Sequence, residues 1–194
     1  MQIEFPRRVF VLGALGLPLA GPARAEGEVL NIASTRGSLD FAIGDSKVFR
    51  TSGGFKKWQG HVQVDDHNVP RSSVEVAVDT NSIEMLDTQQ TAMLKDIEFF
   101  DVSKFPSMTF KSTAIERTGE TTLKVVGDLT LRGITRPMQL DVSVTDRRPD
   151  APAGRRYATF RAEGSLKRSE FGMVKYIDVV GDNVDISIRT DAWR

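Results

Sequence analysis

Two stretches of alternating apolar and polar residues, joined by a glycine-containing turn, constrain the fold of this chain more than any other feature of its sequence. Before the turn, the apolar side chains on one parity are Leu123, Val125, Leu129 and Leu131; after it they are Met138, Leu140, Val142 and Val144. A period of two is typical of a strand with one buried face. Gly133 supplies the backbone freedom of a tight turn, and Pro137 fits only at a strand start or edge, where no ladder donor is needed. The segment therefore predicts two half-buried strands that meet at a hairpin.

The same alternation recurs along most of the chain. Its apolar positions are Leu39, Phe41, Ile43; Val62, Val64; Val74, Val76, Val78; Met108, Phe110; Phe160, Leu166; Val184, Ile186, Ile188. Turn signals rich in Gly, Pro, Asp and Asn separate these runs. We expect an all-β antiparallel meander of about eight strands, and alternation alone leaves a closed barrel and a sandwich both open.

One segment, residues 87–95, breaks the strand pattern. Asp87 is a suitable N-cap and Gln90 stands at the capping-box position, with Met93 and Leu94 on an apolar edge. The pattern predicts a short helix, which in a barrel would cover one mouth.

The first 25 residues have the composition of a cleaved secretory signal. Arg7 and Arg8 precede an apolar run that is too short to span a membrane, and Ala23 and Ala25 suit cleavage before Glu26. Arg7-Arg8-Val9-Phe10 also matches the core of a twin-arginine signal, which leaves the export route open. Residues 26–194 then form one domain, which we expect in the periplasm.

Composition argues against several classes of function. Removing the signal takes three basic and one acidic side chain from 26 of each, and the resulting net charge of −2, with interspersed signs, is not that of a nucleic-acid binder. There is no cysteine, and His61 and His67 occupy outward strand and turn positions. No nucleophile–base pair, paired carboxylates or metal set stands at recognisable spacing, so we expect no enzyme, no metal and no cofactor.

Phenylalanine is the most informative of the apolar residues. It occurs eleven times, and Phe41, Phe55, Phe110 and Phe160 share the inward parity of their strands. An eight-stranded barrel is wide enough either to be filled by side chains or to hold one small ligand. Inward aromatic residues alone leave both arrangements open.

Four motifs connect the chain to a known family. Residues 127–137, GDLTLRGITRP, closely resemble the motif GDLT-hydrophobic-x-G-V/I-T-K/R-P of the YceI-like family of periplasmic polyisoprenoid-binding proteins. In the family's order, residues 54–60 resemble its GxFxxFxG strand, residues 81–83 its T/N-S-hydrophobic strand end, and residues 99–113 its segment dFfdvxkyPxxxFxST. The resemblance covers about residues 39–193.

The resemblance implies a lipocalin-like barrel with the short helix near one mouth, and a non-enzymatic carrier of a long-chain isoprenoid lipid of polyprenyl or quinone type. The ligand-binding candidates are Phe41, Phe55, Trp58, Val76, Ile83, Leu86, Met93, Leu94, Phe99, Phe100, Phe110, Leu129, Phe160, Arg132 and Arg136. The alternative is an accessory protein with a largely packed barrel that docks on a membrane partner such as a b-type cytochrome. The oligomeric state is open between monomer and homodimer.

The helix departs from the family pattern. Family members commonly carry an Arg-Asp pair and a His there, whereas this chain has Gln90, Thr91 and Met93. Since a diphosphate that leaves water needs cationic or several hydrogen-bonding partners, we expect residues 85–100 to gate the cavity and to favour neutral head groups. Arg132 and Arg136 would weaken that preference if their turn lies at the helical end of the barrel.

Overall fold

The structure is a computed structural model that describes residues 27–44 and 50–194. Its strands are β1 (Glu28–Ala33), β2 (Gly37–Ile43), β3 (Thr51–Phe55), β4 (Trp58–Val64), β5 (Ser73–Asp79), β6 (Ile83–Met85), β7 (Ser107–Arg117), β8 (Thr122–Leu131), β9 (Ile134–Thr145), β10 (Arg156–Lys167) and β11 (Asn183–Trp193). The α-helices are α1 (Thr88–Lys95) and α2 (Ile177–Val180), and the 3-10 helices are η1 (Ser34–Arg36), η2 (Val69–Arg71), η3 (Thr80–Ser82) and η4 (Arg168–Phe171). The expected signal segment, residues 1–25, lies outside the described residues.

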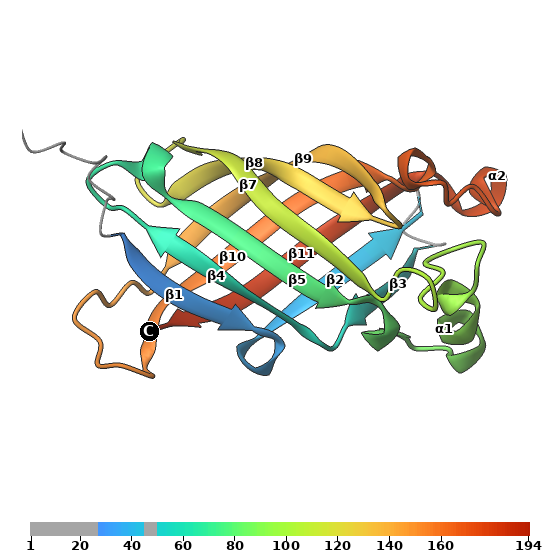
Figure 1. Ribbon diagram of the computed structural model, residues 1–194, viewed down its shortest axis with the longest axis horizontal. Coiled ribbons are helices and arrows are strands. Elements are labelled where there is room, and N and C mark those ends of the chain that lie inside the picture. Colours follow the sequence, from blue (N-terminus) through green and yellow to red (C-terminus); the bar gives the residue numbers. More distant parts are fainter. Residues whose placement is uncertain (1–26, 45–49) are drawn as a thin grey trace, which may run out of the picture.

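The strands form one antiparallel sheet that closes on itself (Figure 1). Its order is β1-β4-β5-β7-β8-β9-β10-β11-β2-β3-β6, and Asn31 of β1 pairs with Trp193 of β11 to complete the circle. β1 and β2 occupy successive parts of one long strand beside β11, and β3 with β4 and β5 with β6 do the same in the next two positions. The predicted eight-stranded antiparallel barrel is therefore confirmed.

The interruptions in these first three long strands preserve the inward face. Inward residues are even-numbered in β1, as at Leu30 and Ile32, and odd-numbered in β2, as at Leu39. The parity changes again from Phe55 in β3 to Trp58 in β4. Because a shift by one residue would turn every apolar side chain outward, each break must contain the extra residue that restores the register.

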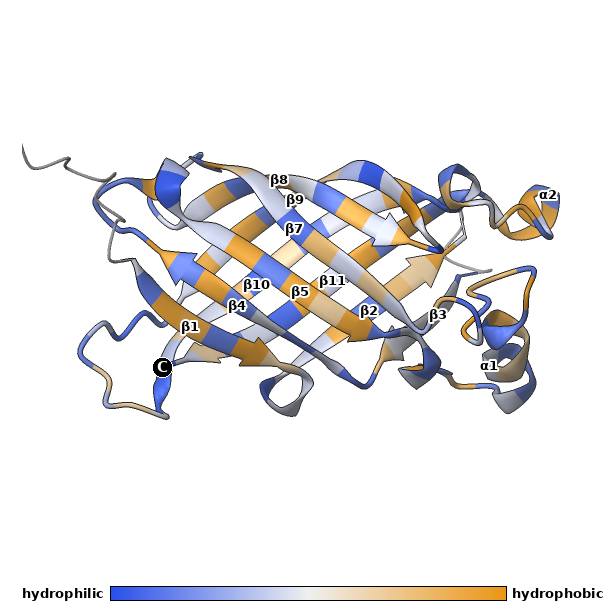
Figure 2. Cartoon of the chain, viewed as in Figure 1, coloured by the Kyte–Doolittle hydropathy of each residue, from blue (hydrophilic) through white to orange (hydrophobic). Residues whose placement is uncertain are grey.

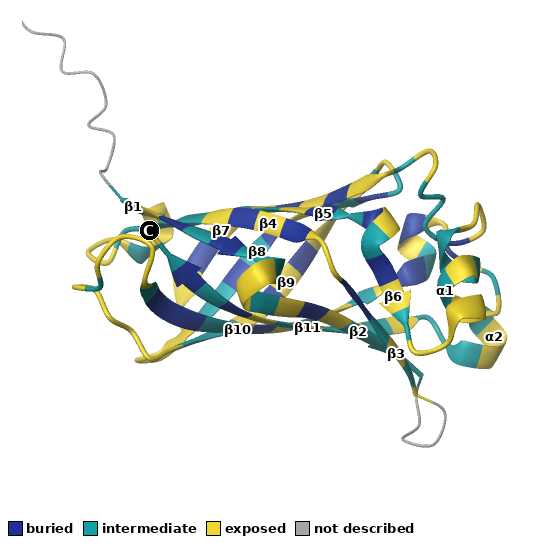
Figure 3. Ribbon diagram, turned by 90° about the horizontal axis from the view of Figure 1, so that it is seen from below, coloured by how far each residue is buried: buried dark blue, intermediate teal, exposed yellow. Residues whose placement is uncertain are grey.

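The core lies inside the barrel, and most of the strands alternate in hydropathy and burial along much of their length (Figures 2 and 3). Leu30, Ile83 and Phe171 are among the most deeply buried side chains.

His61 and Glu75 face each other on the outside of β4 and β5, where Glu75 forms a 2.7 Å ion pair with Lys111 of β7. Hydrogen bonding to Lys111 lowers the pKa of Glu75, and this carboxylate belongs to a solvated exterior.

The hairpin between β8 and β9 has the predicted tight turn. Leu131 pairs with Ile134, and the two residues between them, Arg132 and Gly133, have φ of 52° and 72°. Two consecutive positive φ angles define the type I′ turn that matches the twist of antiparallel strands. Pro137 lies in the first half of β9, whereas the pairing of β9 with β10 runs from Asp141 to Thr145. Pro137 thus occupies a strand edge, as its missing N–H requires.

Replacing Gly133 by Ala is expected to destabilise the barrel by about 1–2 kcal/mol, because a side chain at positive φ clashes with its own backbone. A Cβ there would also lie 3.1 Å from Cε1 of Phe105. Gly154 has a similar φ of 76° and open space around its Cβ position, so Gly154→Ala isolates the backbone strain. Urea unfolding of both variants measures the effect, and equal losses at the two sites would show that the Phe105 contact contributes nothing.

The two ends of the barrel differ. Both α-helices lie at one end, and the C-terminus lies at the other, where the side chains of Glu28 and Arg194 form an ion pair (Figure 1). We call these the helical end and the far end. Within the described part of the chain, no helix combines the length and apolarity needed to cross a membrane.

Candidate functional site

A cavity of about 440 Å³ lies inside the barrel. Its wall is formed mainly by aliphatic and aromatic side chains from strands all around the sheet, and it extends from Met93 of α1 at the helical end to Tyr157 at the far end. Cavities that hold small organic ligands measure about 300–1,000 Å³. Of the two arrangements open to an eight-stranded barrel, the structure has the one with room for a ligand.

Most of the sequence-predicted ligand contacts lie on this wall. They are Phe41, Phe55, Trp58, Val76, Met93, Leu94, Phe99, Phe100, Phe110, Leu129 and Phe160. At the helical end, the rings of Phe41 and Phe55 are 5.8 Å apart, and Phe55 meets the edge of Phe100 at 5.5 Å. These aromatic residues join the strand wall to the segment that follows α1.

Two of the apolar predicted contacts lie outside the cavity wall. Ile83 is fully buried beneath the helical end, in the core rather than at the cavity surface. Leu86 is fully exposed. It follows Met85, the last residue of β6, and since successive side chains point to opposite faces, Met85 reaches the cavity while Leu86 points to solvent.

The α1 segment forms one side of the mouth. As predicted, Asp87 caps the helix, and its carboxylate accepts hydrogen bonds from Gln89 N at 2.7 Å and Gln90 N at 2.9 Å. None of the eight helical residues is fully buried. A helix this short is not stable alone, so α1 depends on the barrel, through contacts such as the 2.9 Å hydrogen bond from Met85 N to Thr91 Oγ1.

The other side of the mouth is the segment 168–182, which contains η4 and α2 and which the sequence analysis did not predict. Glu98 of the α1 side forms an ion pair with Lys175, and the rings of Phe99 and Tyr176 stack with their centroids 6.5 Å apart. Figure 3 shows α1 and α2 together at this end. The two segments therefore meet across the mouth and together close the helical end.

Comparison with known proteins identifies the family. The model of the YceI-like domain matches residues 30–192. Protein YceI of Salmonella arizonae is 32% identical over 139 residues, which are 72% of this chain and 72% of that protein. The chain belongs to the YceI-like family. Two solved structures share the fold of this YceI-like barrel. BcnA of Burkholderia cenocepacia has a TM-score of 0.72 at 24% identity over 84% of this chain and 99% of its own. A polyisoprenoid-binding domain from Saccharophagus degradans, implicated in plant cell wall breakdown, has a TM-score of 0.59 at 11% identity over 86% and 98%.

The hairpin arginines of this YceI-like barrel lie near the mouth but off the cavity wall. Arg132 donates to the carbonyl oxygens of Ile97 at 3.1 Å and Gly172 at 3.3 Å, so its turn lies at the helical end and ties the two mouth segments together. Arg136 is exposed and donates to the carbonyl of its neighbour Thr135. The expected preference for neutral head groups is weakened, because a cationic turn shares the end of the barrel where the helix lies.

Arg168 is a charged residue of the cavity wall that sequence reasoning missed. It is only 4% exposed. Its Nε donates to Gly181 O at 2.9 Å and its Nη1 to Met173 O at 3.0 Å. Burial lowers the pKa of the guanidinium, and the nearby Asp182 opposes that shift. Its only sequence signal was a basic residue directly after the apolar alternation of β10.

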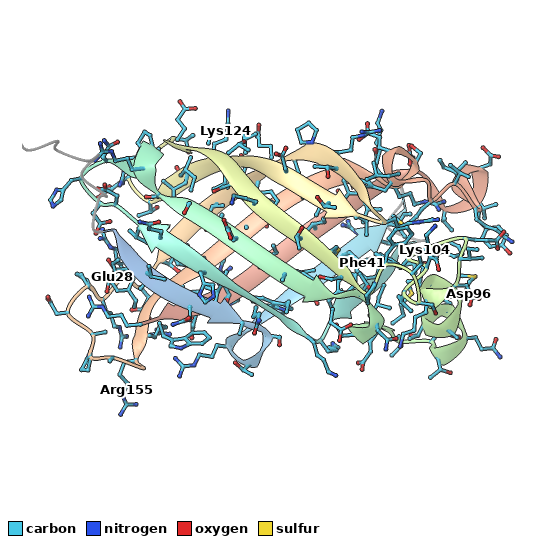
Figure 4. All side chains as sticks on the ribbon, in the orientation of Figure 1. Glu28, Phe41, Asp96, Lys104, Lys124 and Arg155 are labelled. Carbon is cyan, nitrogen blue, oxygen red and sulfur yellow. The ribbon has the colours of Figure 1, made fainter. Side chains whose placement is uncertain are left out.

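A cluster of three polar side chains lines the cavity at its far end. Arg147 forms an ion pair with Asp66 and donates to Tyr157 Oη at 3.1 Å, and all three residues line the cavity. The hydrogen bond with Tyr157 raises the pKa of Arg147. Figure 4 shows Glu28 and Arg155 at this end, and Asp96 and Lys104 at the helical end. Between its polar ends, the YceI-like cavity is predominantly apolar.

Across residues 27–44 and 50–194, no three His, Cys, Asp or Glu side chains are grouped as a metal site. His61 and His67 are both exposed, as expected from their positions. The wall of the cavity is apolar along its length, with polar groups at its two ends.

Asp182 is expected to make the mouth segment sensitive to acid. Burial raises the pKa of its carboxyl, but hydrogen bonds from Ser169 Oγ at 2.7 Å and Ser169 N at 2.8 Å outweigh that effect and lower the pKa below its ordinary value. A lowered pKa in the folded state gives stability that is present above about pH 4 and is lost as the pH falls through the folded value. Urea titrations from pH 7 to pH 3 should show a smaller acid loss in Asp182→Asn than in the parent protein. Identical pH profiles would contradict this assignment.

Proposed function

We propose that this YceI-like chain is a non-enzymatic carrier of a long-chain isoprenoid lipid, of polyprenyl or quinone type, held inside the barrel. The observation that carries this proposal is the apolar cavity of about 440 Å³ along the barrel. Each methylene moved from water into such a cavity contributes about 0.8 kcal/mol. A long apolar tail would therefore bind tightly with few polar contacts, and no catalytic group is needed.

A relative supports the choice of ligand class. The structurally similar domain from Saccharophagus degradans is described as polyisoprenoid-binding. The aromatic and branched side chains of the present wall, such as Phe41, Phe110 and Val76, suit a branched, unsaturated chain. The similarity to that domain and the composition of the cavity wall are the two reasons for proposing an isoprenoid ligand for this protein.

We also propose that the protein works in the periplasm after removal of residues 1–25. N-terminal sequencing of the protein from the periplasm is expected to begin at Glu26, and Met1 at the N-terminus would contradict this.

Replacing Arg7 and Arg8 by Lys is expected to block export if the twin-arginine route is used, since that route recognises the arginine pair. Undiminished export would assign the general secretory route.

Native mass spectrometry of protein purified from its own periplasm, followed by organic extraction, tests the carrier function. We expect an adduct whose extracted mass corresponds to an isoprenoid lipid. Titration of delipidated protein with a long-chain ubiquinone and with a prenyl pyrophosphate of matched tail length should show saturable binding of at least one of them. Ligand-free protein that binds neither probe would overturn the proposal.

The alternative, a protein that docks on a membrane partner such as a b-type cytochrome, is favoured by one observation. Several apolar side chains near the mouth are exposed: Leu86, Ile97, Val174, Tyr176 and Val179. The cavity argues against the packed barrel of that alternative, but a lipid carrier could also dock through this surface. The lipid extraction separates the two, because a docking protein with no lipid function would yield no isoprenoid.

A further inference from the structure

Two buried side-chain donors lack an acceptor among the described residues, and both belong to residues of the cavity wall. They are Nε1 of Trp58 and Nη2 of Arg168. Buried polar groups nearly always have a hydrogen-bond partner, and an unpaired one costs free energy. A ligand that brings an acceptor oxygen to either donor would satisfy it.

Arg168 is held in place by contacts with its own segment. Its backbone N donates to Asp182 O at 3.0 Å, Met173 N donates to its carbonyl at 3.1 Å, and its Nε and Nη1 bond to the carbonyls of Gly181 and Met173. The guanidinium is thereby oriented before any ligand arrives. A preorganised donor loses little freedom on binding.

The charge of Arg168 is not neutralised by a direct ion pair. The ion pairs found within residues 27–44 and 50–194 do not include it. The negative charge of Asp182 acts on Arg168 without a direct contact, because the two carboxylate oxygens of Asp182 accept hydrogen bonds from Ser169 N and Ser169 Oγ. A buried charge that has only neutral carbonyl partners remains costly, and an anionic partner would offset that cost better than a neutral one.

We propose that Arg168 is the head-group recognition residue of the cavity, and that its Nη2 donates to an anionic oxygen of a phosphorylated isoprenoid whose tail fills the barrel. The inference rests on the proposed carrier function and selects, within it, the phosphorylated class over the quinones. It replaces the preference for neutral head groups drawn from the uncharged residues of α1, because the cation stands on the opposite side of the mouth.

The test compares geranylgeranyl phosphate with geranylgeraniol, which share one tail and differ in the head group. Charge-assisted hydrogen bonds to a buried site are expected to make the phosphate bind roughly 10- to 100-fold more tightly to the parent protein. Arg168→Gln should remove that ratio and leave the affinity for the alcohol unchanged. Arg136→Gln, which changes an exposed arginine that donates to the carbonyl of its neighbour Thr135, is the matched control and should keep the ratio.

The side-chain nitrogen resonances of Arg168 in the parent protein give a second measurement that needs no variant. They should shift on addition of the phosphate and not of the alcohol. Equal affinity of the two probes, or a ratio that survives Arg168→Gln, would overturn the Arg168 proposal while leaving the carrier function intact. Loss of the ratio in Arg136→Gln instead would move the head group to the β8–β9 hairpin. Failure of both probes to bind would contradict the carrier function itself.

Discussion

Replacing Val76 by Trp is expected to weaken the binding of a long-chain isoprenoid by about 30-fold. Val76 lies on β5 with Gly60 of β4 and Phe110 of β7 as its register neighbours, and its side chain lines the cavity. An indole in this place would displace two to three methylenes of the ligand, which is about 2 kcal/mol of lost burial. Titration of delipidated protein with geranylgeraniol measures the effect.

The matched control is the same exchange one residue further along β5. Ala77 is exposed on the outer face of the barrel, so Ala77→Trp adds the same indole without occupying the cavity. Overpacking a filled core typically costs about 1–3 kcal/mol, and the space beside Val76 should keep the loss of stability small. Equal lipid affinity of the two variants would show that the cavity is not the binding site.

Replacing Phe171 by Ala is expected to lower the free energy of unfolding by about 3–5 kcal/mol, the usual cost of removing a buried phenyl ring. Phe171 is 1% exposed and ends η4, which contacts β9. Its ring belongs to the main core and fixes the segment that carries Arg168. Urea unfolding followed by circular dichroism provides the measurement.

Val179→Ala is the control for Phe171→Ala, because Val179 lies in the same segment but is 80% exposed. Exposed substitutions of this kind usually change stability by less than about 0.5 kcal/mol. A loss below 1 kcal/mol in Phe171→Ala would show that the segment 168–182 packs more loosely than its burial indicates.

The sequence was sufficient to predict the features that depend on local pattern. Alternation placed Val76, Phe110 and Leu129 on the cavity side, and Asp87 marked the start of α1. The hairpin turn followed from Gly133 because positive φ is a local requirement. In each case the physical cause lies within a few residues of the signal.

The remaining features depend on contacts between distant residues. The mouth segment 168–182 has no periodicity of its own, and it is held by Arg132 from the hairpin and by Glu98 from the α1 side. Arg168 is buried because its hydrogen-bond acceptors are carbonyls that the same segment folds around it. A single sequence shows neither which carbonyls meet it nor that a barrel surrounds it, so this candidate site required the structure.

The ion pair between Glu28 and Arg194 has a practical consequence. It places the first described strand and the last residue of the chain together at the far end, opposite α1 and α2 (Figure 1). A tag or surface linker joined at Arg194 would hold the molecule with its helices facing the solution. Such oriented immobilisation would present the mouth uniformly to vesicles flowing over a sensor chip, so that lipid capture could be timed on a single population of molecules.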